Sequence, residues 1–125
     1  MSLRNLVAGD LVDAVDGGVR DVVNPATGDV IAEVPEGTQA DVDRAVAAAK
    51  AAFPGWRDTT PGERSLAMLK LADLLEQNAD ELSALESANV GKPMAVAREE
   101  MPLTVDNLRF FAGAARTLEG RAAGE

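Results

Sequence analysis

The stretch VIAEVPEGTQADVDRAVAAAK, residues 30–50, contains a change from strand periodicity to helix periodicity. Up to Pro35, apolar residues occupy every second position, as in a strand with one buried face. From Val42 onward they recur at spacings of three and four, as in an amphipathic helix. Thr38, with Asp41 three residues later, is a capping pair that marks the start of that helix. The stretch therefore predicts strands first and helices afterwards, which is an α+β fold.

Two antiparallel hairpins are expected upstream of the change. Residues 5–14 contain two short apolar runs around Gly9-Asp10, a pair typical of a hairpin turn. Residues 17–35 repeat this arrangement on a larger scale, with NPATG, residues 24–28, between the two runs. Proline and glycine in that segment favour a turn. On local grounds NPATG is a turn and nothing more.

The first helix is expected to run from Thr38 to the Pro54-Gly55 pair, with Trp56 in the connection that follows. Its positions at helical spacing form one apolar face. The residues of that face are Val42, Ala45, Val46, Ala49 and Phe53.

A second helix is expected to begin at residues 60–63, where Thr60 caps, Pro61 takes the first helical position and Glu63 reaches back to the cap. Asn78, with Glu81 three residues on, offers another cap, so the segment up to residue 90 should form two short helices in series. The apolar stripe of the second helix comprises Leu66, Leu69, Leu74 and Leu75.

A last helix is expected over residues 95–118, with a bend or a restart at Pro102, because a proline inside a helix loses a hydrogen bond and crowds the preceding turn. Gly120 is its expected stop. The buried face of this helix is expected to comprise Leu108, Phe111, Ala112 and Ala115. The chain should thus contain four or five helices.

Composition limits the kinds of function that the chain can have. Only 3% of its 125 residues are aromatic, and much of its 46% hydrophobic content is alanine, which buries little area. The core that this chain can form by itself is therefore expected to be thin. A net charge of −9 disfavours nucleic-acid partners, since an acidic surface repels phosphates.

Missing residue types exclude further chemistry. The chain has no cysteine and no histidine, which removes thiolate nucleophiles, cysteine-ligated metals and the commonest general base. No apolar run approaches the roughly 20 residues of a membrane span. The N-terminal residues are too polar for a signal peptide. A cytoplasmic location and no membrane partner are expected.

Gly91-Lys92 raises the question of a phosphate-binding loop. Such a loop needs a glycine five residues before the Gly-Lys pair and a serine or threonine after it, but Glu86 and Pro93 occupy those positions. A glycine just after a helix, with a proline two residues later, is instead the usual pattern of a helix end. We therefore predict no nucleotide site here.

The remaining candidate chemistry is sparse. Ser65, Ser83 and Ser87 have no histidine to activate them. Glu99 and Glu100 are adjacent, so on a helix they point roughly 100° apart and cannot face each other across a substrate. A solvated helix face is the simple interpretation of this pair. The residues alone predict an acidic, mainly helical module with no catalytic residue.

Five segments taken together carry a resemblance to a known family. They are NPATG at residues 24–28, AFPGW at 52–56, RSLAMLKLAD at 64–73, GKP at 91–93 and FFAG at 110–113. In this order and at this spacing, they resemble the N-terminal region of the NAD(P)-dependent aldehyde dehydrogenase superfamily. The resemblance extends from about Gly9 to Glu125.

The resemblance implies an oxidoreductase that converts an aldehyde to a carboxylic acid with NAD or NADP. It implies a longer α/β enzyme with a Rossmann-like cofactor domain, a catalytic domain with a nucleophilic cysteine, and an oligomerisation arm. Residues 1–125 would be its N-terminal portion. Within that portion, residues 1–37 would be a β-hairpin region, and residues 38–120 a helical region that packs on the cofactor domain.

The catalytic Cys, the general base and the cofactor-binding residues of that family lie beyond the position of residue 125. Without a thiolate no thiohemiacetal forms, so no hydride reaches a nicotinamide. We therefore expect this chain to be a fragment of such an enzyme that is inactive alone, binds no cofactor alone, and meets the aldehyde only in the parent. Its partners would be the rest of the enzyme or, through exposed apolar faces, other copies of itself. The alternative is a catalytically inert helical interaction module derived from the same family.

The resemblance also implies two candidate sites. The first is a monovalent cation site for Na⁺ or K⁺, with the main-chain carbonyls of Val22 and Val23 and the side-chain oxygen of Asn89 as ligands, which are suitable hard donors. Many relatives carry Asp where this chain has Asn89, and an amide lacks the full charge. A plain helix-end role for Asn89 is the competing interpretation.

The second candidate site is the substrate entrance. Residues 97–113 are similar to the γ-aminobutyraldehyde dehydrogenase branch, which places an acidic residue there to face the amino group of the substrate. Glu100 matches that position best, with Glu99, Leu103 and Asp106 as neighbours. An ammonium–carboxylate pair is the physical reason for an acid at this place. An aminoaldehyde substrate is therefore expected.

Overall fold

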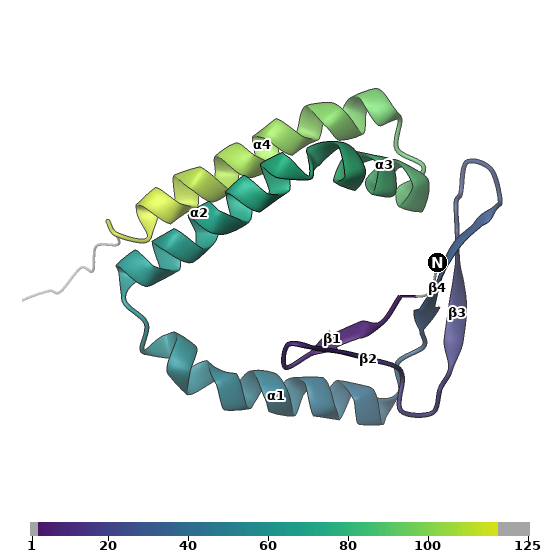
Figure 1. Ribbon diagram of the computed structural model, residues 1–125, viewed down its shortest axis with the longest axis horizontal. Coiled ribbons are helices and arrows are strands. Elements are labelled where there is room, and N and C mark those ends of the chain that lie inside the picture. Colours follow the sequence, from purple (N-terminus) through teal and green to yellow (C-terminus); the bar gives the residue numbers. More distant parts are fainter. Residues whose placement is uncertain (1–2, 118–125) are drawn as a thin grey trace, which may run out of the picture. The chain divides into compact units, whose positions relative to one another are not determined.

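The computed structural model describes residues 3–117, which form two antiparallel hairpins followed by four helices (Figure 1). This order confirms the predicted α+β fold. The strands are β1 (Asn5–Val7), β2 (Asp10–Val12), β3 (Val19–Val23) and β4 (Val30–Pro35). The helices are α1 (Gln39–Arg57), α2 (Pro61–Gln77), α3 (Ala79–Val90) and α4 (Met94–Ala114). None of the helices within residues 3–117 is both long enough and apolar enough to cross a membrane.

The first hairpin turns at Ala8-Gly9. Both residues have positive φ angles, 54° and 93°, and Val7 pairs with Asp10, so the connection is a two-residue turn with the twist that hairpins favour. Asp10 is the first residue of β2 instead of part of the turn. The predicted turn is therefore displaced by one residue.

NPATG is confirmed as the turn of the second hairpin. The N–H of Asn24 donates to the carbonyl of Asp29, and the N–H of Gly28 donates back to the carbonyl of Asn24. Directly before the turn, Val22 pairs with Ala32 but Val23 pairs with Val30. Between these two pairs β3 advances by one residue and β4 by two, so the extra residue of this β-bulge is in β4.

Helix α1 begins at the predicted capping box but continues beyond its predicted end. It passes through Pro54 and Gly55 to Arg57, so the prediction of a stop at that pair, with Trp56 in a connection, is wrong. The proline removes a single N–H from the helix, and its own carbonyl still accepts from the N–H of Asp58 at 3.1 Å. One missing bond in the last turn does not end the helix.

The start of α2 and its separation from α3 follow the predictions. Glu63 accepts from the N–H of Thr60 at 2.7 Å, and the hydroxyl of Thr60 accepts from the N–H of Glu63 at 3.2 Å. Asn78 separates α2 from α3. Its side-chain amide donates to the carbonyl of Leu74 at 2.8 Å, which serves the end of α2 and not the start of α3.

Helix α4 is one continuous helix through Pro102, so the predicted restart does not occur. It ends at Ala114, four residues before the predicted end. Gly120, the predicted stop, lies outside the described residues.

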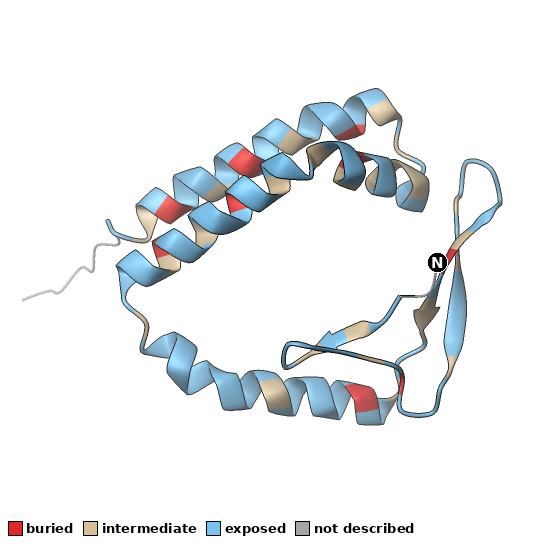
Figure 2. Ribbon diagram, viewed as in Figure 1, coloured by how far each residue is buried: buried red, intermediate tan, exposed pale blue. Residues whose placement is uncertain are grey.

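The chain divides into two compact units, whose described parts are residues 3–58 with 86–92 and residues 59–85 with 93–117. In the second unit α2 and α4 lie side by side (Figure 1). The residues buried between the helices of that unit are mostly small, as the red segments of Figure 2 show. They are Ser65, Ala72, Ser83, Ala97, Val105 and Ala112. Ser83 lies on α3 and the other five lie on α2 and α4, and we call the contact of these five the α2–α4 seam.

The larger apolar residues lie mostly outside the seam. Phe111 is 57% exposed, so its predicted burial is wrong, whereas Ala112 is buried and Leu108 and Ala115 are half-buried. Of the predicted leucine stripe of α2, only Leu75 is half-buried; Leu66, Leu69 and Leu74 are exposed. Small residues line the seam because they allow the two helices to approach each other closely.

Candidate functional site

The four residues predicted at the substrate entrance all lie on α4 and are all exposed. The buried residues of α4 mark the side that faces α2. At roughly 100° per residue, Glu99, Leu103 and Asp106 fall on the opposite side of the helix, and Glu100 falls at its margin. The structure thus brings three of the four onto one face and places the fourth beside it.

Two apolar residues missed by the sequence analysis belong to the same face. Val96 and Phe110 each lie seven residues from Leu103, and the three are 41%, 68% and 61% exposed. We call Val96, Glu99, Leu103, Asp106 and Phe110 the outer face of α4. A spacing of seven on a helix was the signal that could have identified it.

The outer face combines an apolar row with carboxylates. Phe110 packs edge-to-face against Phe111, with ring centroids 5.3 Å apart, which holds an aromatic surface at one end of the row. Carboxylates flank the row at Glu99 and Asp106. Such a surface suits an apolar chain that carries a positive charge.

Ion pairs join α4 to the helix opposite. Nη2 of Arg109 lies 2.7 Å from Oε2 of Glu76 and 3.0 Å from Oδ1 of Asp73, both on α2. The hydrogen bond and the charge of Arg109 lower the pKa of Glu76 below its ordinary value. These contacts fix α4 against α2 from the side of the seam.

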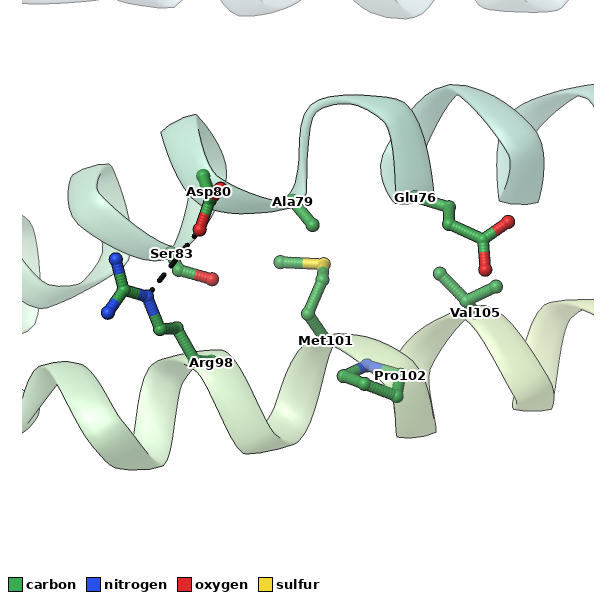
Figure 3. A pocket seen from close by; sticks show the side chains of 8 residues that line it. All are labelled: Glu76, Ala79, Asp80, Ser83, Arg98, Met101, Pro102 and Val105. Carbon is green, nitrogen blue, oxygen red and sulfur yellow. Dashed lines mark ion pairs between the residues drawn. The ribbon is translucent and has the colours of Figure 1, made fainter.

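A cavity of about 230 Å³ opens along the same contact (Figure 3). Its floor is apolar, with Met101 and Val105 pointing toward α2 and α3, and its rim carries the ion pair between Nε of Arg98 and Oδ1 of Asp80, 3.5 Å apart. The full lining is Glu76, Ala79, Asp80, Ser83, Arg98, Met101, Pro102 and Val105. Ser83 is buried there and donates to the carbonyl of Ala97 at 3.4 Å.

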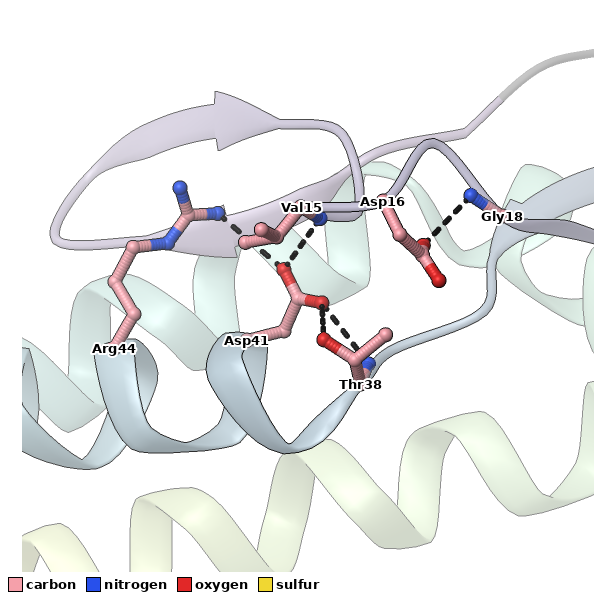
Figure 4. Close-up of polar contacts among 6 residues, drawn as sticks. All are labelled: Val15, Asp16, Gly18, Thr38, Asp41 and Arg44. Carbon is pink, nitrogen blue, oxygen red and sulfur yellow. Dashed lines mark hydrogen bonds and ion pairs between the residues drawn. The ribbon is translucent and has the colours of Figure 1, made fainter.

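Asp41 is a buried carboxylate, and its surroundings decide whether it could act as a base (Figure 4). Oδ2 accepts from the N–H and the hydroxyl of Thr38 at 2.9 and 2.8 Å, and Oδ1 accepts from the N–H of Val15 at 3.0 Å. The bonds from Thr38, followed by those from Val15 and the charge of Arg44, lower the pKa of Asp41. A carboxylate whose two oxygens both accept hydrogen bonds and whose pKa is lowered holds two segments of the chain together and does not serve as a general base.

Gly91 ends α3, as predicted, and does not open a phosphate loop. Its φ angle is +72°, and its N–H donates to the carbonyl of Ser87 at 3.0 Å. Nζ of Lys92 lies 2.9 Å from Oε1 of Glu86, and the carbonyl of Lys92 accepts from the hydroxyl of Ser87 at 2.7 Å. The Gly-Lys pair is therefore folded back onto α3.

The end of α3 meets the NPATG turn. A Cβ atom placed on Gly91 would lie 3.0 Å from Cγ of Pro25. Val22 and Val23 directly precede that turn, at the register shift between β3 and β4, and Asn89 lies two residues before Gly91. The three residues predicted as cation ligands are thus carried by two segments that touch one another, and the cation itself stays a prediction.

The family model described as "Aldehyde dehydrogenase family" matches residues 12–125. The chain belongs to the aldehyde dehydrogenase family. An aldehyde dehydrogenase of Alternaria alternata is 46% identical over 114 residues, and the 2-aminomuconic semialdehyde dehydrogenase of Bos taurus is 41% identical over 113 residues. Each of these alignments covers 90% of this chain and 23% of the relative.

Solved structures agree with the family assignment. The crystal structure of PnpE in complex with nicotinamide adenine dinucleotide superposes with a TM-score of 0.94 at 42% identity, and that of PnpE from Pseudomonas sp. WBC-3 superposes with a TM-score of 0.93 at 42% identity. The superposition covers all of this chain and 26% of PnpE. This aldehyde dehydrogenase segment therefore spans about a quarter of the length of the relatives that it matches.

This aldehyde dehydrogenase segment contains no cysteine and no histidine. The outer face of α4 combines exposed apolar side chains with carboxylates.

Proposed function

We propose that the protein carrying this segment is an NAD-dependent aldehyde dehydrogenase, and that the outer face of α4 forms part of its substrate entrance. The family match over residues 12–125 supports the reaction class. The complex of PnpE with nicotinamide adenine dinucleotide supports NAD as the cofactor. The bound nicotinamide would supply the hydride acceptor, and none of residues 3–117 is proposed to hold it.

The observation that carries the entrance proposal is the exposed row of Val96, Leu103 and Phe110 between carboxylates. An aldehyde has an apolar body, which such a row can guide by burial of its methylene groups. The alternative role, an inert helical interaction module, has no support among the relatives described above, which are named as dehydrogenases.

The activity is tested with the protein in its full natural length. Purified protein should reduce NAD in the presence of an aldehyde, with NADH followed by its absorbance. The 125-residue chain alone should not do so, because it has no thiolate. If the 125-residue chain formed NADH from NAD and an aldehyde, the residues that oxidise the aldehyde would lie within this chain, which would contradict the proposal.

We propose further that the substrate is an aminoaldehyde such as γ-aminobutyraldehyde. The support is the acidic character of this part of α4, where Glu99, Glu100 and Asp106 surround Leu103. A carboxylate beside the entrance would attract an ammonium group, and it would offer nothing to a neutral aldehyde of the same length.

The substrate proposal predicts a selective change in KM. Glu100→Gln should raise KM for γ-aminobutyraldehyde about 3- to 10-fold and leave KM for butanal unchanged, since only the charged substrate loses an ion pair. Glu81→Gln, which neutralises an exposed carboxylate on α3, is the matched control and should change neither value. Equal effects of Glu100→Gln on both aldehydes would refute an aminoaldehyde preference.

A monovalent cation is proposed at the contact between the NPATG turn and the end of α3. Val22 and Val23 lie where the pairing of β3 with β4 shifts register, and their main-chain carbonyls would be ligands together with the amide oxygen of Asn89. Raising K⁺ in place of choline at constant ionic strength should then raise the melting temperature of the full-length protein. Asn89→Asp should enlarge that rise and Asn89→Ala should abolish it; an equal response in all three proteins would exclude the site.

The exposed apolar face of α1 is proposed to pack on the remainder of the protein. Val42, Val46 and Phe53 are 53%, 59% and 57% exposed and share one side of the helix. Patches of this kind mark contact surfaces. The 125-residue chain alone should therefore self-associate in sedimentation velocity, and Val46→Glu should reduce that association. A monomer at all concentrations would contradict the proposal.

A further inference from the structure

The α2–α4 seam is made of side chains that discriminate poorly between axial registers. Ala72 and Ala112 are fully buried, and Ala97 is nearly so. Helices choose a register by fitting the ridges of one into the grooves of the other, and small side chains make shallow ridges. The buried residues alone therefore hold the axial position of α4 on α2 only weakly.

Two arginines of α4 supply what the small residues lack. Arg98 and Arg109 lie three helical turns apart on the same side of α4, and both pair with acids of the opposite helices. Arg98 pairs with Asp80, and Arg109 pairs with both Asp73 and Glu76. The partner number falls as the arginine number rises, as it does between antiparallel helices, but Asp80 lies on α3, so the pairs of Arg109 are the ones that set the position of α4 on α2.

Pro102 lies between the two arginines and makes a second anchor necessary. A proline at this position removes the N–H that would bond to the carbonyl of Arg98, which softens the helix at this turn. An anchor at Arg98 alone would hold the part of α4 after Pro102 less firmly than the part before it. Leu103, Asp106 and Phe110 all belong to that part.

We propose that Arg109 is a positioning residue for the substrate entrance. Its planar guanidinium bridges two carboxylates on successive turns of α2 and so fixes both the axial position and the rotation of the second half of α4. This inference rests on the proposed function, in which the outer face of α4 lines the entrance. A slip of one residue shifts a helix by about 1.5 Å and turns it by about 100°, which would turn Leu103 away from its position.

Four variants of the full-length protein test the proposal. Arg109→Met keeps the apolar stem and removes the charge, and Arg109→Lys keeps the charge but cannot bridge two carboxylates as a fork. The double variant Asp73→Asn with Glu76→Gln removes both acceptors and leaves the arginine. Lys70→Met, which removes a positive charge from an exposed site on α2, is the matched control.

Two readouts are needed. Hydrogen exchange followed by mass spectrometry reports the protection of residues 103–112 and does not depend on activity. Steady-state kinetics with hexanal and with acetaldehyde reports the entrance, because a long aldehyde contacts more of it than a short one. Arg109→Met should increase the rate of hydrogen exchange in residues 103–112 by about 3- to 10-fold. It should change the ratio of the KM for hexanal to the KM for acetaldehyde by about 3- to 10-fold as well, while kcat for acetaldehyde stays within about 2-fold of wild type.

The other variants complete the pattern. The double carboxamide variant should reproduce Arg109→Met, Arg109→Lys should fall between that variant and wild type, and Lys70→Met should match wild type in both readouts. Unchanged exchange in Arg109→Met would overturn the role of Arg109 in holding α4. Increased exchange with an unchanged KM ratio would overturn its role in positioning the entrance. If the wild-type protein oxidised no aldehyde, the proposed function would fail, and the exchange experiment would still decide whether Arg109 fixes α4.

Discussion

Replacement of Gly91 by alanine tests the contact between the end of α3 and the NPATG turn. Gly91 has a φ angle of +72°, where an alanine costs about 1–2 kcal/mol relative to a helical or extended backbone. The lower entropy of the unfolded alanine chain offsets about 0.5 kcal/mol of that cost. The added Cβ would also lie 3.0 Å from Cγ of Pro25, so the ring must move by a few tenths of an ångström, at about 1 kcal/mol. The expected loss is about 2 kcal/mol.

Gly28→Ala is the matched control, because Gly28 has a similar φ of +81° and nothing lies within 4 Å of an added Cβ. Its expected loss is about 1 kcal/mol, from the backbone alone. Both glycines belong to the same compact unit as Trp56, the only tryptophan of the chain. Urea unfolding of the dilute 125-residue chain, followed by tryptophan fluorescence, therefore measures both losses with one probe.

The difference of about 1 kcal/mol between the two variants isolates the contact with Pro25. Pro25→Ala in the Gly91→Ala background should remove this excess, because the smaller side chain makes room for the new methyl group. Equal losses for Gly91→Ala and Gly28→Ala would show that α3 does not meet the turn as described.

Three further changes probe the helices. Pro54→Ala should stabilise the chain by about 1 kcal/mol in urea, because it restores a hydrogen bond in the last turn of α1; a loss of stability would show that the ring makes a needed contact. Thr60→Ala should cost about 1 kcal/mol and Thr60→Ser little, as judged from thermal melts by circular dichroism; equal melting temperatures for wild type and Thr60→Ala would contradict the capping box. The pKa of the Asp41 carboxyl is lowered in the folded chain. The ionised carboxylate therefore contributes its full stabilisation above the ordinary pKa of 3.8, and this contribution is lost as the pH falls through the pKa of the folded chain. The stability difference between wild type and Asp41→Asn, measured by urea midpoints from about pH 6 to pH 2, should therefore shrink below about pH 4, and a constant difference would refute the role of the charge.

Local patterns identified most of the secondary structure because each depends on a few neighbouring residues. The capping boxes at Thr38 and Thr60, the turn at NPATG and the helix end at Gly91 are all of this kind. Pro54 shows the limit of such rules, since one missing N–H near a helix end costs less than the continuation of the helix gains.

Helix faces were harder to predict because burial depends on what each helix meets. Helical spacing predicts burial for larger apolar residues such as Phe111 and the leucines of α2, whereas alanine, serine and one valine line the seam. The anchor at Arg109 was missed for a related reason. Its partners lie 33 and 36 residues away in sequence, and no local spacing connects them.

The two oxygens of Asp41 link events in folding that are far apart in the sequence. Oδ2 binds Thr38 three residues away and can do so as soon as the first turn of α1 forms, whereas Oδ1 binds Val15, which lies 26 residues away. Closing a separation of 26 residues costs more chain entropy than closing one of three, so we expect the bond to Thr38 to form before the bond to Val15. One side chain would thus favour an order of assembly: the start of α1 first, the loop after β2 second.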